Sequence, residues 1–284
     1  MILNSILILG GSGLIFGVIL AVVSRKFAVA VDPKEELITK LLPGVNCGAC
    51  GFPGCSGYAN AMVTGKAAAG LCPAASGEAV KKIGEILGIE VEVREKKVAK
   101  VMCGGQDSEL KYIYRGIESC FSARQVAGGF RSCGFSCLGL GDCVKACPVD
   151  AINYERNRIP EINPEKCTAC GKCLDACPVK VIRLVPAGAG VYVKCNSNDR
   201  GPAVKKICKT GCFTCKICVK FCPQQAISIV AELAVIDYRQ CNNCGICVQK
   251  CPAGTILFTP AYKGGLAAAE SKAETAGTNN QNQP

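Results

Sequence analysis

The chain begins with a long apolar run. No charged side chain occurs from Met1 to Ser24, and most positions hold Ile, Leu, Val, Phe, Ala or Gly. At about 1.5 Å per residue, such a run is long enough to cross a hydrocarbon core of roughly 30 Å as one helix. Arg25 and Lys26 follow it. Because positive charges favour the cytoplasmic side, we expect a transmembrane helix over residues 1–24, a single-pass protein in the cell membrane, and the bulk of the chain on the cytoplasmic side.

Patterns typical of short helices follow the apolar run. Asp32 precedes Pro33, and a polar cap followed by proline is a frequent start of a helix. Tyr58, Ala61 and Met62 recur at helical spacing and predict a second helix.

Residues 76–102 combine both kinds of periodicity. Ser76 to Leu87 has helical spacing, and Ile89 to Arg94 and Val98 to Met102 alternate as short strands do. Because many lysines and arginines lie among them, we interpret this stretch as a small solvated linker element.

The composition changes this picture through its cysteines. The chain has 284 residues, of which 24 are cysteine and none is histidine or tryptophan. The absence of histidine excludes Rieske centres, histidine-containing zinc sites and Ser–His or Cys–His catalysis. No acid/base pair or nucleophile is evident, so no catalytic side chain is predicted. Because the cytoplasm keeps thiols reduced, so many cysteines on that side indicate bound metal and not disulfides.

The formal net charge of +11 would ordinarily raise the question of nucleic-acid binding. If all cysteines held six cubes with cores of about +2, that charge would fall to about −1, because each ligating thiolate is negative. The basic residues also form no continuous stripe with interleaved aromatic residues. We therefore predict no nucleic-acid partner.

The first group of cysteines lies in a glycine-rich segment and has the spacing C-x2-C-x4-C-x16-C. Thiolates at this spacing can reach neighbouring irons of one cube, and the glycines leave backbone N–H groups free to point at its sulfides. A zinc knuckle would accept the same four sulfur atoms, so the spacing alone leaves both metals open. The four residues are Cys47, Cys50, Cys55 and Cys72.

The rest of the chain repeats a cysteine motif. The run C-x2-C-x2-C-x3-C-P occurs three times and is the signature of two-cluster bacterial ferredoxins, in which the fourth cysteine binds the other cluster. Exchanging the fourth cysteines within each pair of runs predicts three [4Fe–4S] quartets. They are Cys212, Cys215, Cys218 and Cys251; Cys222, Cys241, Cys244 and Cys247; and Cys147, Cys167, Cys170 and Cys173.

The companion of the last quartet departs from the pattern. Leu140 stands where the middle cysteine should be, and Cys133, four residues before Cys137, can supply the missing thiolate. We therefore expect a quartet of Cys133, Cys137, Cys143 and Cys177, with a three-iron cluster as the competing interpretation. Four cysteines remain, and they either form a sixth cube or are unrelated buried thiols. They are Cys103, Cys120, Cys195 and Cys208.

These observations predict an α+β chain with at least five [4Fe–4S] clusters, and six if the remaining cysteines converge. We expect a small all-cysteine iron–sulfur domain followed by two ferredoxin-like two-cluster units of pseudo-twofold form. The predicted segments are a transmembrane helix (1–24), a membrane-proximal [4Fe–4S] domain (25–75), a linker (76–132), a first unit (133–185), a connector (186–207), a second unit (208–261) and a disordered tail (262–284).

Together, the apolar N-terminal run, the Cys47–Cys72 segment and the paired ferredoxin runs resemble the B subunit of the Rnf complex, in its clostridial form. That family belongs to a membrane complex that exchanges electrons between ferredoxin and NAD and moves sodium ions or protons. The resemblance implies an electron-transfer subunit that accepts electrons from soluble ferredoxin. It also implies a flavin-bearing, NADH-oxidising partner subunit and integral membrane partner subunits.

Two alternatives remain at this point. The chain could be a membrane-tethered zinc scaffold without redox chemistry, or a polyferredoxin of another redox complex such as a hydrogenase or a quinone reductase. The Cys47–Cys72 segment favours the Rnf family over the second of these.

Overall fold

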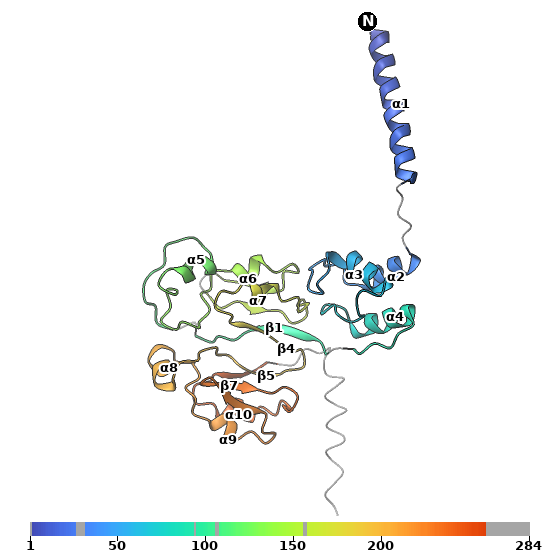
Figure 1. Ribbon diagram of the computed structural model, residues 1–284. Coiled ribbons are helices and arrows are strands. Elements are labelled where there is room, and N and C mark those ends of the chain that lie inside the picture. Colours follow the sequence, from blue (N-terminus) through green and yellow to red (C-terminus); the bar gives the residue numbers. More distant parts are fainter. Residues whose placement is uncertain (1, 27–31, 94, 106–107, 156–157, 260–284) are drawn as a thin grey trace, which may run out of the picture.

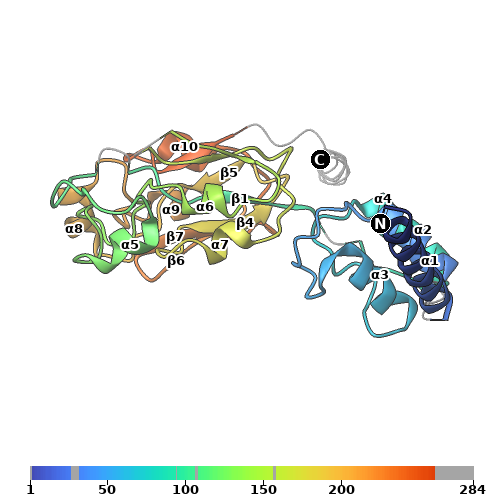
Figure 2. The same ribbon diagram turned by 90° about the horizontal axis from the view of Figure 1, so that it is seen from above.

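The structure is a computed structural model that describes residues 2–26, 32–93, 95–105, 108–155 and 158–259. A small helical domain lies to one side of two larger α+β units in both Figure 1 and Figure 2. The predicted disordered tail over residues 262–284 lies outside the described residues.

The first helix, α1 (Ile2–Lys26), corrects the predicted membrane placement. Among the helices of the described ranges, none combines the length and apolar character needed to cross a membrane. α1 contains four glycines and ends in two basic residues, Arg25 and Lys26. The predicted transmembrane helix over residues 1–24 and the single-pass location are therefore contradicted.

The small domain consists of three helices, α2 (Pro33–Leu41), α3 (Gly54–Val63) and α4 (Gly77–Leu87). The cap expected at Asp32 is present, because its side chain accepts a hydrogen bond from the Lys34 N–H, and Ser76 caps α4 by accepting one from the Ala79 N–H. The helices pack around a core that includes Ile38, Tyr58 and Ile83.

The two larger units repeat one order of elements, helix–strand–strand–helix–strand. The first unit contains α6 (Asp142–Lys145), β2 (Ile152–Asn153), β3 (Glu161–Ile162), α7 (Lys172–Asp175) and β4 (Ile182–Pro186). The second contains α9 (Ile217–Lys220), β6 (Ile227–Val230), β7 (Leu233–Ile236), α10 (Ile246–Lys250) and β8 (Ile256–Phe258). β2 pairs with β3, and β6 pairs with β7, both antiparallel.

The last strand of each unit pairs with a strand that comes from outside the cysteine runs. β1 (Lys97–Val101) pairs antiparallel with β4, and β5 (Val191–Val193) pairs antiparallel with β8. Each pairing continues by one more hydrogen bond. The Met102 N–H donates to Val181 O beyond the first pair, and the Lys194 N–H donates to Thr255 O beyond the second. Each unit is therefore completed by an earlier strand.

These strands also revise the interpretation of residues 76–102. The predicted strand over Val98 to Met102 is present as β1, but residues 89–93 form no strand. Val98 and Val101 are buried in the core of the first unit, and Ile83 of α4 is buried in the small domain. β1 and α4 are therefore packed parts of folded domains and not solvated linker elements. Their lysines lie between apolar side chains that face a core.

A long segment separates each outer strand from the first cysteine run of its unit. The segment after β1 contains α5 (Cys120–Gln125), and the segment after β5 contains α8 (Gly201–Ile207). We call these the first insertion (residues 102–132) and the second insertion (residues 194–211). They touch each other, since the Glu109 N–H donates a hydrogen bond to Ile207 O.

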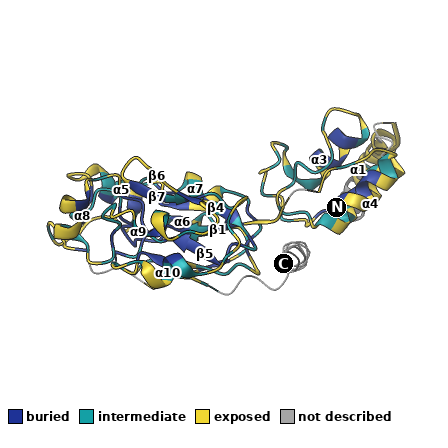
Figure 3. Ribbon diagram, turned by 90° about the horizontal axis from the view of Figure 1, so that it is seen from below, coloured by how far each residue is buried: buried dark blue, intermediate teal, exposed yellow. Residues whose placement is uncertain are grey.

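The two units are packed against each other. Tyr238 lies against the buried cores of both units, and Figure 3 shows buried residues within the body that they form. The Asn243 side chain accepts hydrogen bonds from the N–H groups of Gly190 and Val191 and donates one to Gly188 O. These contacts hold the cysteine loops of the second unit at a fixed position relative to the strand that follows the first unit.

Candidate metal centres

The cysteines of the small domain gather around the loop before α3. Burial raises the pKa of the Cys72 thiol, and the neighbouring thiols of Cys50 and Cys47 raise it further. The Cys55 N–H donates to Asn46 Oδ1 across 2.8 Å, which shapes the loop. Gly54 has a φ of +87°, and a Cβ there would lie 2.9 Å from that oxygen, so the tight turn requires glycine.

The second unit brings together both of its predicted quartets. Burial raises the pKa of Cys218 to about 11, with further contributions from Cys212, Cys215 and Cys251. These four cysteines line one recess of about 390 Å³. Burial likewise raises the pKa of Cys247 to about 11, with contributions from Cys241, Cys244 and Cys222.

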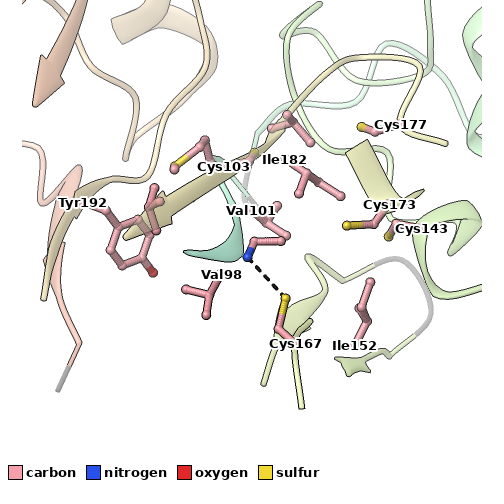
Figure 4. Close-up of a cluster of buried hydrophobic side chains, with 14 of the residues drawn as sticks. Val98, Val101, Cys103, Cys143, Ile152, Cys167, Cys173, Cys177, Ile182 and Tyr192 are labelled. Atoms are coloured by element: carbon pink, nitrogen blue, oxygen red, sulfur yellow. Dashed lines mark hydrogen bonds between the residues drawn. The ribbon is translucent and has the colours of Figure 1, made fainter. Parts of the chain in front are cut away.

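The first unit brings together its regular quartet. Burial raises the pKa of Cys173 to about 12, and the thiols of Cys167, Cys143, Cys170 and Cys147 contribute in that order. All but Cys143 belong to the regular quartet, and together with Cys173 they line one recess. The Ala99 N–H of β1 donates to Cys167 Sγ, and the Ala151 N–H donates to Cys147 Sγ, each across 3.4 Å. Figure 4 shows the first of these bonds reaching from β1 to the cysteine loop. Such bonds stabilise charge on ligand sulfur.

Cys120, and not Cys133, lies beside two cysteines of the other predicted quartet of the first unit, Cys143 and Cys177. Burial raises the pKa of Cys143 to about 12, and the next contributions come from Cys120 and Cys177. Burial also raises the pKa of Cys137, and the thiols of Cys103, Cys120 and Cys143 raise it further. Leu140 is buried against Cys120 and its neighbours, so it fills space with hydrocarbon at the position where the other runs have a cysteine.

Cys133 lies in a different group. Burial raises its pKa, and the thiols that contribute are Cys103 and Cys208. With Cys195, these residues line a separate recess between the two insertions. The structure therefore divides the eight cysteines outside the regular quartets differently from the sequence-based expectation.

The surroundings of these thiols suit a polynuclear cluster. Within the described ranges, no three Cys, Asp or Glu side chains converge closely enough to hold a single metal ion. An iron–sulfur cube spreads its four ligand sulfurs over a wider shell than one ion does. The donors are thiols alone, four of them line each recess, and backbone N–H groups point at the sulfurs of Cys167 and Cys147.

Three family models match the chain. A model described as "Putative Fe-S cluster" matches residues 42–74, and models described as "4Fe-4S dicluster domain" match residues 134–184 and 211–255. The three matches cover the three cysteine-rich domains of the structure.

Full-length relatives decide the family. The chain is 40% identical to the B subunit of the ion-translocating oxidoreductase complex of Methanosarcina acetivorans over 84% of this chain and 92% of the relative. It is 42% identical to the B subunit of the Na⁺-translocating ferredoxin:NAD⁺ oxidoreductase complex of Acetobacterium woodii over 84% of this chain and 74% of the relative. The proton-translocating counterpart of Clostridium ljungdahlii is 38% identical, over 81% and 82%.

The chain belongs to the Rnf B-subunit family. It is an electron-transfer subunit of an oxidoreductase complex and carries several [4Fe–4S] clusters. The comparisons give no support to a zinc scaffold or to a polyferredoxin of a different complex.

A signal for the different grouping was present in the sequence of this Rnf B subunit. Cys133 stands four residues before Cys137, and Cys208 stands four residues before Cys212, at the same place in the two units. Because the two spacings are the same, Cys133 corresponds in sequence to Cys208 and does not belong to the first cysteine run. No comparable spacing marks Cys120, which reaches its position only through the fold of the first insertion.

Proposed function

We propose that this Rnf B subunit accepts electrons from reduced soluble ferredoxin and delivers them to the other subunits of an ion-translocating ferredoxin:NAD oxidoreductase. The partners are integral membrane subunits and a flavin-bearing, NADH-oxidising subunit. The names of the Acetobacterium and Clostridium relatives support the two substrates. The observation that carries the proposal is the packing of two dicluster units into one body, which holds several thiol quartets at fixed positions.

Five quartets would hold the clusters of this pathway, and bound [4Fe–4S] clusters supply the one-electron carriers. The chain itself fixes their spacing, excludes water and donates hydrogen bonds to ligand sulfur. The quartets are Cys47, Cys50, Cys55 and Cys72; Cys120, Cys137, Cys143 and Cys177; Cys147, Cys167, Cys170 and Cys173; Cys212, Cys215, Cys218 and Cys251; and Cys222, Cys241, Cys244 and Cys247.

Electrons enter at the second unit in this proposal. Cys215 and Cys244 of this unit are exposed, and Lys216, Lys220 and Lys250, near the cysteines in the sequence, are exposed as well. The Lys220 and Lys250 ammonium groups lie 6.0 and 5.4 Å from the centroid of the Phe221 ring. We call Lys216, Lys220 and Lys250 the lysine patch. A positive patch beside accessible ligands suits an anionic electron donor, and thiolate-bound clusters make a ferredoxin more anionic.

Charge reversal in the lysine patch tests this entry point. The triple variant Lys216→Glu, Lys220→Glu and Lys250→Glu should lower the second-order rate constant for oxidation of reduced ferredoxin about tenfold at low ionic strength. The loss should shrink as salt is added, because salt screens long-range attraction. A matched control reverses three exposed lysines of the small domain, Lys34, Lys66 and Lys81. An equal loss in both triple variants would show that net charge matters and the patch does not.

Electrons leave through the small domain in the same proposal. In the assembled complex, Cys47→Ala should block transfer to the partner subunits, while oxidation of ferredoxin by the second unit continues. Stopped-flow measurements that follow ferredoxin and the partner flavin separately distinguish the two steps. Equal loss of both would contradict this order.

A further inference from the structure

Three cysteines from the two insertions and one directly after the first insertion line one recess. Cys103 follows β1, Cys195 follows β5, Cys133 precedes the first cysteine run, and Cys208 directly follows α8. We call them the bridging quartet. The sequence analysis grouped Cys103, Cys195 and Cys208 with Cys120 in a possible sixth cube. In the structure the fourth member of this group is Cys133 and not Cys120.

The bridging quartet is arranged with the pseudo-symmetry of the two units. Cys103 and Cys195 each stand two residues beyond the end of an outer strand, Val101 of β1 or Val193 of β5. Cys133 and Cys208 each stand four residues before the first cysteine of a unit's run. The quartet therefore consists of two equivalent pairs, one from each unit. Four unrelated buried thiols would have no reason to occupy equivalent positions.

The recess has the size of the recesses around the ferredoxin-type quartets. It takes in about 360 Å³ of empty space, part of it open to solvent. Measured in the same way, the recess lined by Cys212, Cys215, Cys218 and Cys251 takes in about 390 Å³, and the one lined by Cys147, Cys167, Cys170 and Cys173 about 320 Å³. These two recesses belong to quartets with ferredoxin-type spacing, and the volume of the recess at the bridging quartet lies between theirs.

Glycines keep the recess open at its walls. A Cβ on Gly105 would lie 3.1 Å from Cys208 Sγ and 3.8 Å from Cys103 Sγ. A Cβ on Gly104 would lie 3.3 Å from Lys194 O, so the two insertions approach each other through glycine backbone. A larger residue at either position would push the pairs of the quartet apart.

The bridging quartet is also directly connected to the quartets on either side. The Cys212 N–H donates to Cys195 Sγ across 3.4 Å, and the Cys137 N–H donates to Cys103 Sγ. Cys212 and Cys137 belong to the flanking quartets of the second and first units. Backbone donors to sulfur stabilise the thiolate form that a cluster needs.

A buried cation accompanies the quartet. Arg131 is buried, and its Nη1 donates to Gly105 O at 3.3 Å and to Ser108 Oγ at 3.1 Å. Its charge lowers the pKa of Cys103, against the larger effect of burial, which raises it. Its guanidinium therefore places positive charge beside Cys103, and a thiolate-bound cube is negative.

We propose that Cys103, Cys133, Cys195 and Cys208 bind a sixth [4Fe–4S] cluster, which connects the two dicluster units. The inference rests on the proposed function in that it assigns this cluster to the same electron pathway. When a cube carrying thiolate ligands enters the site, each cysteine sulfur bonds one iron and displaces one of those ligands, which takes up the proton of the cysteine thiol. Four iron–sulfur bonds form and four break per cube, and no electron is transferred in that step. Cys120 then belongs to the first unit and replaces the cysteine that is missing at Leu140.

Iron counting in paired variants tests the assignment. Cys208→Ala and Cys133→Ala should each remove about four irons per chain, the content of one cube. Because the two residues share a cluster, the double variant should lose no more iron than either single variant. Cys120→Ala with Cys133→Ala should lose about twice as much, since these residues belong to different clusters. Mössbauer spectra of anaerobically prepared full-length chains count the clusters independently of activity.

The outcomes separate this inference from the proposed function. If Cys120 and Cys133 prove to share one cluster, or if Cys208→Ala leaves the iron content unchanged, the bridging quartet is overturned while the rest of the pathway stands. If the unmodified chain binds no iron, the proposed function fails. Full retention of the other clusters in a variant shows that the variant folds.

Discussion

The hydroxyl of Ser119 donates a hydrogen bond to the carboxylate of Asp142 across 2.9 Å. The Phe121 N–H donates to the same oxygen, also across 2.9 Å. Together these bonds fix the start of α5 to the start of α6, and so place Cys120 next to Cys143. One carboxylate thus holds the inserted segment that makes up for Leu140.

Loss of that carboxylate should loosen one cluster. Asp142→Ala removes the acceptor for both bonds, so iron held with the help of Cys120 should pass to a chelator faster than in the unmodified chain. Asp142→Asn keeps an oxygen acceptor and should have a smaller effect. The measurement is the time course of chelation, in which about four irons should change rate. Glu155→Ala, at an exposed ion pair with Arg158, is the control. Equal rates in Asp142→Ala and the control would contradict this role.

The Ala99 hydrogen bond should tune a redox potential. The Ala99 N–H donates to Cys167 Sγ and not to β4, so Ala99→Pro removes the donor without removing a ladder hydrogen bond. A lost N–H···S bond destabilises the more negative reduced state, and the potential of the cluster at Cys167 should fall. Ala99→Gly keeps the N–H and should change the potential much less. Redox titration followed by electron paramagnetic resonance reads the shift. An unchanged potential in a folded Ala99→Pro chain would contradict this role of the Ala99 hydrogen bond.

Tyr58 should stabilise the small domain through its hydroxyl. The buried Tyr58 hydroxyl donates to Ala68 O at 2.8 Å and accepts from the Leu71 N–H at 3.0 Å, next to Cys72. Tyr58→Phe leaves both backbone groups without this partner and should cost about 1–3 kcal/mol in the free energy of unfolding of this domain. Hydrogen exchange of α3 measures the loss. Tyr112→Phe removes one exposed hydrogen bond elsewhere and should leave that exchange unchanged.

Asn243 should hold the two units in register. Its side chain satisfies three backbone groups of residues 188–191, and its φ of +59° is one that glycine tolerates. Asn243→Gly therefore removes the side chain without adding backbone strain. Hydrogen exchange at residues 190 and 191 should rise by at least about tenfold, because those N–H groups lose their acceptor. Protection that stays as it was would show that other contacts between the units suffice.

Local spacing made much of the site predictable. Ligands that lie within one run, such as Cys212, Cys215 and Cys218, are placed by a short loop, and the structure brings them together as the spacing indicated. The cap at Asp32 depends on neighbouring residues and was predicted for the same reason.

Contacts that depend on chain topology were not predictable in this way. Cys120 reaches Cys143 because an inserted segment folds back, and proximity in the sequence favoured Cys133 instead. β1 resembled part of a linker because its partner β4 lies more than eighty residues further along the chain. The apolar N-terminal run predicted a membrane-spanning helix, and the described helices contain none.

The central claim is that these cysteines hold iron–sulfur clusters, and the iron and acid-labile sulfide of anaerobically prepared chains test it most directly. The account predicts brown protein with about 24 irons and about 24 sulfides per chain, from six cubes, and an absorbance that dithionite bleaches. Colourless protein that contains stoichiometric zinc and no iron would contradict it.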